Sequence, residues 1–87
     1  DAYRLILKNL KYLEENKAKK SYPTFWATVE SVSRFNRIRR KDVAMALHSM
    51  IDKGYVVQKE VDFGGGKIIQ SISVDWKKCR ADGIDAD

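Results

Sequence analysis

The sequence contains little cysteine, histidine or proline: Cys79, His48 and Pro23 are the only residues of their types. One cysteine excludes an internal disulfide and cannot by itself form a thiolate metal site. One histidine cannot supply a histidine-based metal cluster or a catalytic triad from a single chain. We therefore expect a binding module and not an enzyme, with no cofactor and no evident small-molecule ligand.

Long apolar stretches are also missing. No run approaches the ~18 residues that a membrane span requires, and no charged leader with an apolar segment and a small-residue cleavage site is present. We expect no membrane association. We expect a cytoplasmic location, or a nuclear one if the source is eukaryotic.

Positive charge is abundant. The 87 residues include 17 Lys and Arg against 12 Asp and Glu, with a net charge of +5 and a pI near 9.4. Residues 80–87 contribute one cation and three acids, so the preceding part of the chain is more basic than the average. Such a surplus attracts polyanions, with nucleic acid first and acidic membrane surfaces or proteins second.

Periodic apolar residues predict three helices. Residues 2–16 and 39–53 repeat apolar side chains at spacings of three and four, and residues 25–35 do so after Pro23, with Thr24 as a candidate cap. Gly54 is a typical end for the third helix. The predicted inward faces contain Tyr3, Ile6, Leu7, Leu10 and Leu13, then Phe25, Val29 and Val32, then Val43, Ala46, Leu47, Met50 and Ile51.

The amino-acid composition of the chain changes after residue 54. "YVVQKEVDF" and "KIIQSISVDW" are rich in β-branched and aromatic residues, and three glycines separate them, which predicts a β-hairpin with a flexible tip. Residues 77–87 lose periodicity and are expected to form a flexible tail or linker after a domain of residues 1–76. The large aromatic side chains are expected mainly in the core of so small a domain. These are Phe25, Trp26, Phe35 and Trp76.

The segment "DVAMALHSMIDKGYVVQKEVD" resembles the winged helix-turn-helix DNA-binding family, and the similarity covers about residues 2–76. The resemblance implies an α+β fold in which a three-helix helix-turn-helix core precedes a hairpin wing. It also implies double-stranded DNA as the partner, with the third helix in the major groove. The implied base contacts are Lys41, Ala44, Met45, His48 and Ser49. The implied phosphate contacts are Thr24, Arg37, Arg39 and Arg40, and the implied wing contacts are Lys59 and Lys67.

One departure concerns the outward face of the third helix. That face contains no arginine, asparagine or glutamine, the side chains that most often make bidentate contacts with guanine or adenine. Direct base reading would depend on lysine, histidine and serine, with apolar contacts to thymine methyl groups. Recognition through backbone contacts or DNA shape is therefore favoured.

Several functional settings fit this pattern. Transcriptional regulation is the first, and an origin-binding or plasmid or phage maintenance module of a larger replication protein is the second. A winged helix used only for protein interaction, or one that stacks single strands on its aromatic residues, remains an alternative. Leu5 and Tyr12 lie off the apolar face of the first helix and could close a homodimer with two-fold half-sites. They could equally pack on the hairpin or on flanking sequence.

Overall fold

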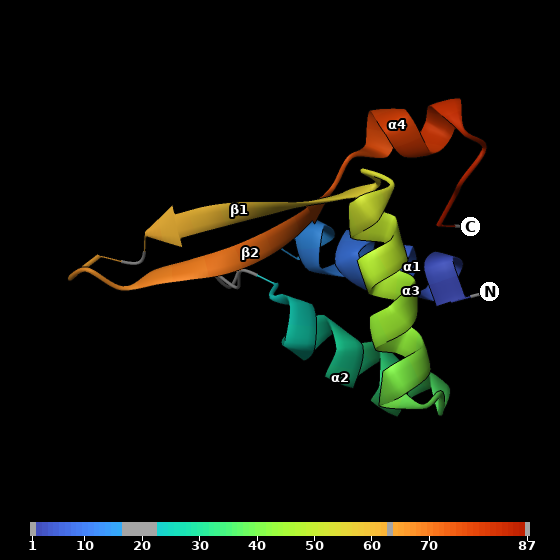
Figure 1. The fold of residues 1–87 in the computed structure, drawn as a ribbon, viewed down its shortest axis with the longest axis horizontal. Helices are drawn as coiled ribbons and strands as arrows, with labels where there is room; N and C mark the ends of the chain where they lie inside the picture. Colours follow the sequence, from blue (N-terminus) through green and yellow to red (C-terminus); the bar gives the residue numbers. More distant parts are fainter. Residues whose placement is uncertain (1, 17–22, 63, 87) are drawn as a thin grey trace.

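The computed structural model describes residues 2–16, 23–62 and 64–86. Three helices precede an antiparallel two-stranded hairpin, which confirms the predicted α+β class and the order of the elements. Figure 1 shows the hairpin projecting away from the helices. The elements are α1 (Ala2–Glu15), α2 (Phe25–Asn36), α3 (Arg40–Asp52), β1 (Val56–Asp62), β2 (Ile68–Val74) and α4 (Trp76–Ala81).

One hydrophobic core joins the three long helices to the base of the hairpin. Each helix contributes apolar residues three or four positions apart, as expected for a helix that buries one side. At about 25 cal/mol per Å² of apolar surface, this burial is the main force that holds so short a chain together. The most deeply buried side chains are Ile6, Leu7, Leu10, Val29, Val32, Val43, Leu47, Met50, Val56 and Ile72.

The start of α2 is fixed by two sets of hydrogen bonds. Thr24 caps the helix as predicted, because its side-chain oxygen accepts a hydrogen bond from the Ala27 N–H at 3.3 Å. The carbonyl oxygen of Pro23 accepts from the Ile72 N–H at 2.9 Å and from the Ser71 hydroxyl at 3.1 Å. These bonds attach the beginning of α2 to the outer edge of β2.

The end of α3 turns the chain into the hairpin. Gly54 adopts a left-handed conformation with φ of 81°, which confirms the predicted glycine stop. The Tyr55 N–H then donates to the carbonyl oxygen of Met50 at 2.9 Å. Met50 is fully buried, so this bond fixes the root of the hairpin against the core.

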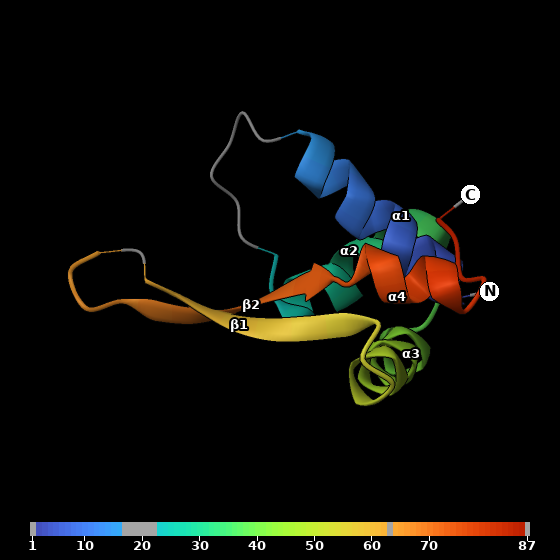
Figure 2. The same cartoon turned by 90° about the horizontal axis from the view of Figure 1, so that it is seen from above.

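The hairpin has a buried base and an exposed outer half. The strands pair from Val56 opposite Val74 to Asp62 opposite Ile68, without a shift of register. Val56, Ile72 and Val74 lie in the core, whereas residues 58–60 and 64–68 are exposed. Figure 2 shows the outer half extending beyond the helices, as an arm held only at its base.

Two of the four aromatic side chains expected in the core are on the surface. Trp26 is 69% exposed and Phe35 is 78% exposed, so the prediction was wrong for them. Phe25 and Trp76 are half-buried and pack against the core. Val29 and Val32 occupy the buried side of α2, and the preference of aromatic residues for burial does not decide which side of a helix they take.

The expected flexible tail is instead ordered up to residue 86. Asp75 caps α4 by accepting a hydrogen bond from the Lys78 N–H at 3.1 Å. Cys79 and Ala86 are buried in the core, and the Tyr55 hydroxyl donates to an Asp82 carboxylate oxygen at 2.7 Å. A six-residue helix is too short to show a clear apolar period, which is why the sequence pattern missed it.

The Cys79 thiol tests whether α4 stays packed in solution. Burial raises the pKa of this thiol, and the carboxylates of Asp75 and Asp82 raise it further. Thiolate is the reactive form, so at pH 8 we expect labelling by a disulfide reagent at least about 10-fold slower than in the unfolded chain. As a control, the thiol of an Ala81→Cys variant in a Cys79→Ala background should react rapidly, because position 81 is exposed. Equal rates for the two thiols would show that α4 is detached.

Candidate nucleic-acid interface

The outward side of α3 carries a stripe of three exposed residues, Lys41, Met45 and His48. Their spacings of four and three align them along one line of the helix. The opposite side buries Val43 and Leu47 completely, so the rotation of α3 about its axis is fixed. Met45 is 62% exposed, an unusual position for a large apolar side chain. We refer to these three residues as the α3 stripe.

Two other predicted base contacts lie beside this stripe and are less open. Ala44 is half-buried and packs against the core. The Ser49 hydroxyl shares a 2.5 Å hydrogen bond with the Tyr3 hydroxyl of α1, so it already has a structural partner. The structure therefore separates the five predicted residues into an open stripe and two flanking positions.

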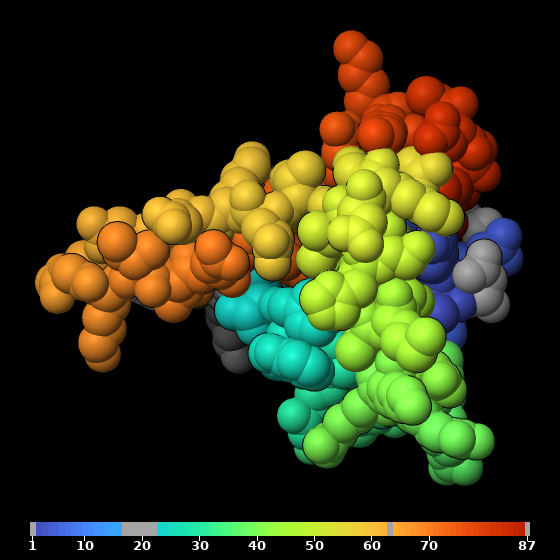
Figure 3. Space-filling model, in the orientation of Figure 1, coloured from blue at the N-terminus to red at the C-terminus, as the bar shows by residue number. Residues whose placement is uncertain are grey.

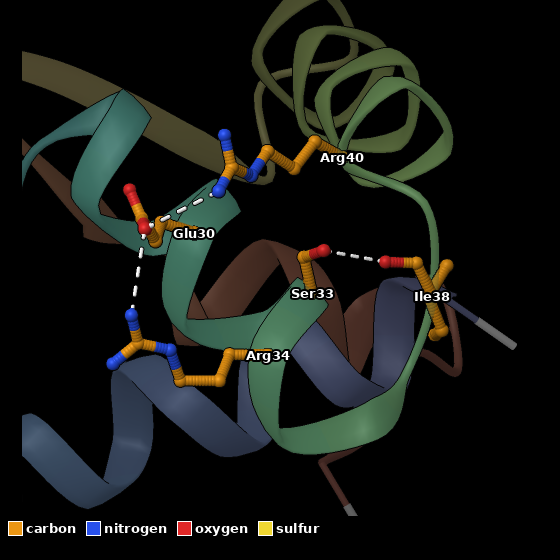
Figure 4. A network of polar contacts seen from close by, with 5 residues as sticks. All are labelled: Glu30, Ser33, Arg34, Ile38 and Arg40. Atoms are coloured by element: carbon orange, nitrogen blue, oxygen red, sulfur yellow. Dashed lines mark hydrogen bonds and ion pairs between the residues drawn. The ribbon is translucent and has the colours of Figure 1, made fainter.

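The connection between α2 and α3 holds three exposed arginines on a firmly attached backbone. Arg37, Arg39 and Arg40 are all exposed. Between them, Ile38 is half-buried, and its carbonyl oxygen accepts a 2.5 Å hydrogen bond from the Ser33 hydroxyl (Figure 4). The backbone of the turn is thus anchored, while the cationic side chains are directed into solvent around the start of α3.

Glu30 of α2 places a negative charge next to these cations. One of its carboxylate oxygens lies 3.5 Å from an Arg40 nitrogen and 3.7 Å from an Arg34 nitrogen (Figure 4). Exposed ion pairs of this kind contribute at most about 1 kcal/mol, so an incoming phosphate can replace the carboxylate at little cost. Arg37 and Arg39 form no ion pair with any residue that the structure describes.

A hollow of about 380 Å³ lies where α2, α3 and the hairpin meet. Its lining combines aromatic rings with side-chain amides, and Figure 3 shows the corresponding segments meeting on one face of the molecule. The Phe25 ring lies 4.9 Å from the Trp26 ring and 4.6 Å from the His48 ring, measured between centroids. The lining residues are Thr24, Phe25, Trp26, His48, Gln58 and Gln70.

Thr24 caps α2 and also keeps a hydrogen-bond donor that is not used by the cap. Its side-chain oxygen accepts the capping hydrogen bond of α2, which leaves the hydroxyl proton able to donate. The residue is half-buried at the rim of the hollow. Among the predicted phosphate contacts, Thr24 therefore lies beside the α3 stripe, at the end of α2 opposite to the arginines.

The two predicted wing cations are not equivalent. Lys67 is exposed in the tip, directly before β2 begins. Lys59 is exposed on β1, where it lines a hollow with Leu10 and Glu14 of α1. Gln58 lines the hollow beside His48, and consecutive strand residues point to opposite faces, so Lys59 faces away from the α3 stripe. Only Lys67 stands at the free end of the arm.

Among residues 2–16, 23–62 and 64–86, no three His, Cys, Asp or Glu side chains come together as a metal site. Over the same residues, no helix is long and apolar enough to cross a membrane.

Arg37 provides a test of the connection, because it is a non-glycine residue with φ of 54°. The left-handed conformation costs an L-residue about 1–2 kcal/mol, which glycine avoids, although glycine loses more entropy on folding. We expect Arg37→Gly to raise the free energy of unfolding by up to about 1 kcal/mol in urea titrations. Arg39→Gly is the control, since Arg39 has an ordinary φ of −62° and should lose about 0.5–1 kcal/mol. A clear loss for Arg37→Gly would mean that its side chain stabilises the turn.

Comparisons with known proteins do not assign this chain to a family. No family model matches it, and no match was found among curated proteins or solved structures. The distinctive features of this surface are an open stripe on α3, arginines around the start of that helix, and the hairpin arm beside it.

Proposed function

We propose that the protein binds double-stranded DNA, with the α3 stripe in the major groove and the hairpin arm against the neighbouring backbone or minor groove. The observation that carries this proposal is the exposure of Arg37, Arg39 and Arg40 around the start of a helix whose outer side is open. Cations placed there would bind phosphates on both sides of an inserted helix. Lys67 would add a contact at the end of the arm.

The dimensions of the parts support this arrangement. An α-helix with its side chains is about 10–12 Å in diameter, and the major groove is about 12 Å wide, so the groove can admit α3. With 13 residues, α3 is about 20 Å long. Strands of seven residues reach about 23 Å, so the tip can touch DNA beyond the groove that α3 occupies. The α3 stripe and the arginines belong to one helix and its entry turn, so they would dock as a unit.

Sequence preference would be modest. Lys41 can donate to guanine, His48 can reach a base edge, and Met45 can contact a thymine methyl group, but the stripe contains neither the rigid guanidinium of arginine nor a side-chain amide that could pair with adenine. We infer that phosphate contacts and DNA shape supply most of the affinity. Transcriptional regulation in the cytoplasm or nucleus is the setting we favour. A role as a replication or plasmid or phage maintenance module is the alternative.

The salt dependence of binding tests the phosphate contacts. If four to six phosphates are neutralised, the logarithm of the binding constant should fall with the logarithm of salt concentration at a slope of about −4 to −5. We expect Arg37→Ala with Arg39→Ala to make this slope shallower by about two and to weaken all duplexes similarly. Fluorescence anisotropy with a labelled duplex, over a series of salt concentrations, measures both quantities.

The matched control removes two exposed charges from α4, through Lys77→Ala with Arg80→Ala. Figure 1 places α4 near the end of α3, away from its arginine-bearing start. The control should leave the slope nearly unchanged. Equal effects of the two pairs would indicate only a general attraction of a basic protein. A different result would favour a protein-interaction module: the protein keeps its cellular function after Arg37→Ala with Arg39→Ala but loses that function after Met45→Ala.

A second candidate, binding of single strands, is favoured by the hollow around Trp26. The indole is 69% exposed beside the amides of Gln58 and Gln70, and aromatic faces with amide groups suit an unstacked base. Stacking of one base on an aromatic residue contributes about 1–3 kcal/mol. This candidate uses the same face of the molecule but a different part of it, so the two can be separated.

Tryptophan fluorescence separates them in a Trp76→Phe background, where Trp26 is the only indole. If duplex DNA is the partner, we expect tighter binding of duplex than of single strand. Trp26→Ala, whose affinity is measured by the anisotropy of labelled DNA, should then change duplex affinity by less than about 3-fold. Strong quenching by single strands, with at least about 5-fold weaker binding after Trp26→Ala, would favour the second candidate.

A further inference from the structure

A second exposed apolar surface lies between α1 and the end of α2. It forms an open groove of about 630 Å³ that includes Leu5 and Tyr12 of α1 and Phe35 of α2. Tyr12 is 64% exposed and Phe35 is 78% exposed. Two large aromatic side chains on one open groove are unusual for a surface without a partner. We refer to this surface as the α1 groove.

Three charged residues of α1 border this groove: Lys8, Lys11 and Glu15. Lys11 already has a contact within the chain, so the charges that remain for a partner are those of Lys8 and Glu15. Leu5 and Tyr12 are seven residues apart and therefore lie on the same line of the helix, two turns from each other. Lys8 and Glu15 are also seven residues apart, on one flank of that line, and they carry opposite charges. Neither forms an ion pair with another residue that the structure describes.

This charge order is complementary to itself when the helix is reversed. In an antiparallel pair related by a two-fold axis, equivalent flanks of the two helices meet on the same side. Lys8 of each copy then lies opposite Glu15 of the other, and the two Tyr12 rings meet near the axis. A partner with a surface of one charge sign would face a like charge at either Lys8 or Glu15, so a second copy satisfies both residues.

We propose that the α1 groove is the site of homodimerisation, with α1 of one copy packed antiparallel against α1 of the second. The aromatic side chains would supply most of the buried apolar area, and the Lys8–Glu15 pairs would set orientation and register. Figure 2 shows α1 and α3 on opposite sides of the molecule, so this contact leaves both α3 stripes open. The proposal does not depend on DNA binding.

Charge reversal tests the proposed register in the absence of DNA. We expect sedimentation equilibrium to show a dimer whose population increases with protein concentration from about 1 µM to about 500 µM. Lys8→Glu alone, or Glu15→Lys alone, places like charges opposite each other twice and should raise the dimer Kd by about 10-fold or more. The double variant exchanges the two charges and should restore the Kd to within about 3-fold of the original chain.

Matched controls separate this contact from general effects. Phe35→Ser should weaken the dimer, whereas Trp26→Ser removes another exposed aromatic residue from the other side of α2 and should not. Lys77→Glu reverses an exposed charge on α4 and should also have no effect. Circular dichroism should show that all variants are folded.

Three results would overturn the proposal. The first is a chain that stays monomeric over the whole concentration range. The second is a dimer that Phe35→Ser leaves unchanged, which would place its contact outside the α1 groove. The third is a double variant no better than the single ones, which would exclude the antiparallel register.

Discussion

The burial of one side of α3 is the constraint on which the rest of the structure depends. Val43, Leu47 and Met50 are each fully enclosed by the core that α1, α2 and the hairpin base share. Because that burial fixes the rotation of the helix, Lys41, Met45 and His48 must face solvent together. The same packing fixes the root of the hairpin through the bond from Tyr55 to Met50. A single core thus determines the relative position of the helix surface and the arm.

Much of this arrangement could be predicted from the sequence, because the period of apolar residues is a direct signal of which side of a helix is buried. Val43, Leu47 and Met50 specify α3 and its open side, and the three glycines between β-branched segments specify the hairpin. The charges of Arg37, Arg39 and Arg40 could be placed at the start of α3 for the same reason. That these arginines bind DNA phosphates is a proposal, which their position supports.

Other features depend on contacts between distant residues and could not be predicted. Ser49 is engaged by Tyr3, 46 positions earlier, which no local pattern reveals. Trp26 and Phe35 are apolar yet exposed, because the buried side of α2 is already filled by valines. The left-handed conformation of Arg37 has no compositional signal, since glycine is the usual residue there. The short helix α4 was signalled only by the capping position of Asp75.

Trp26 and Phe35 lie in two different surfaces, which suggests two separate uses of the molecule: a polyanion at α3 and the arm, and a second copy at the α1 groove. Nuclear magnetic resonance titration of the ¹⁵N-labelled chain with a short duplex tests the central claim most directly. We predict that the largest amide shift changes fall on residues 37–48 and near Lys67, with little change in the outward residues of α1 or in α4. Shift changes centred on α1 or α4, or none at all, would contradict the account.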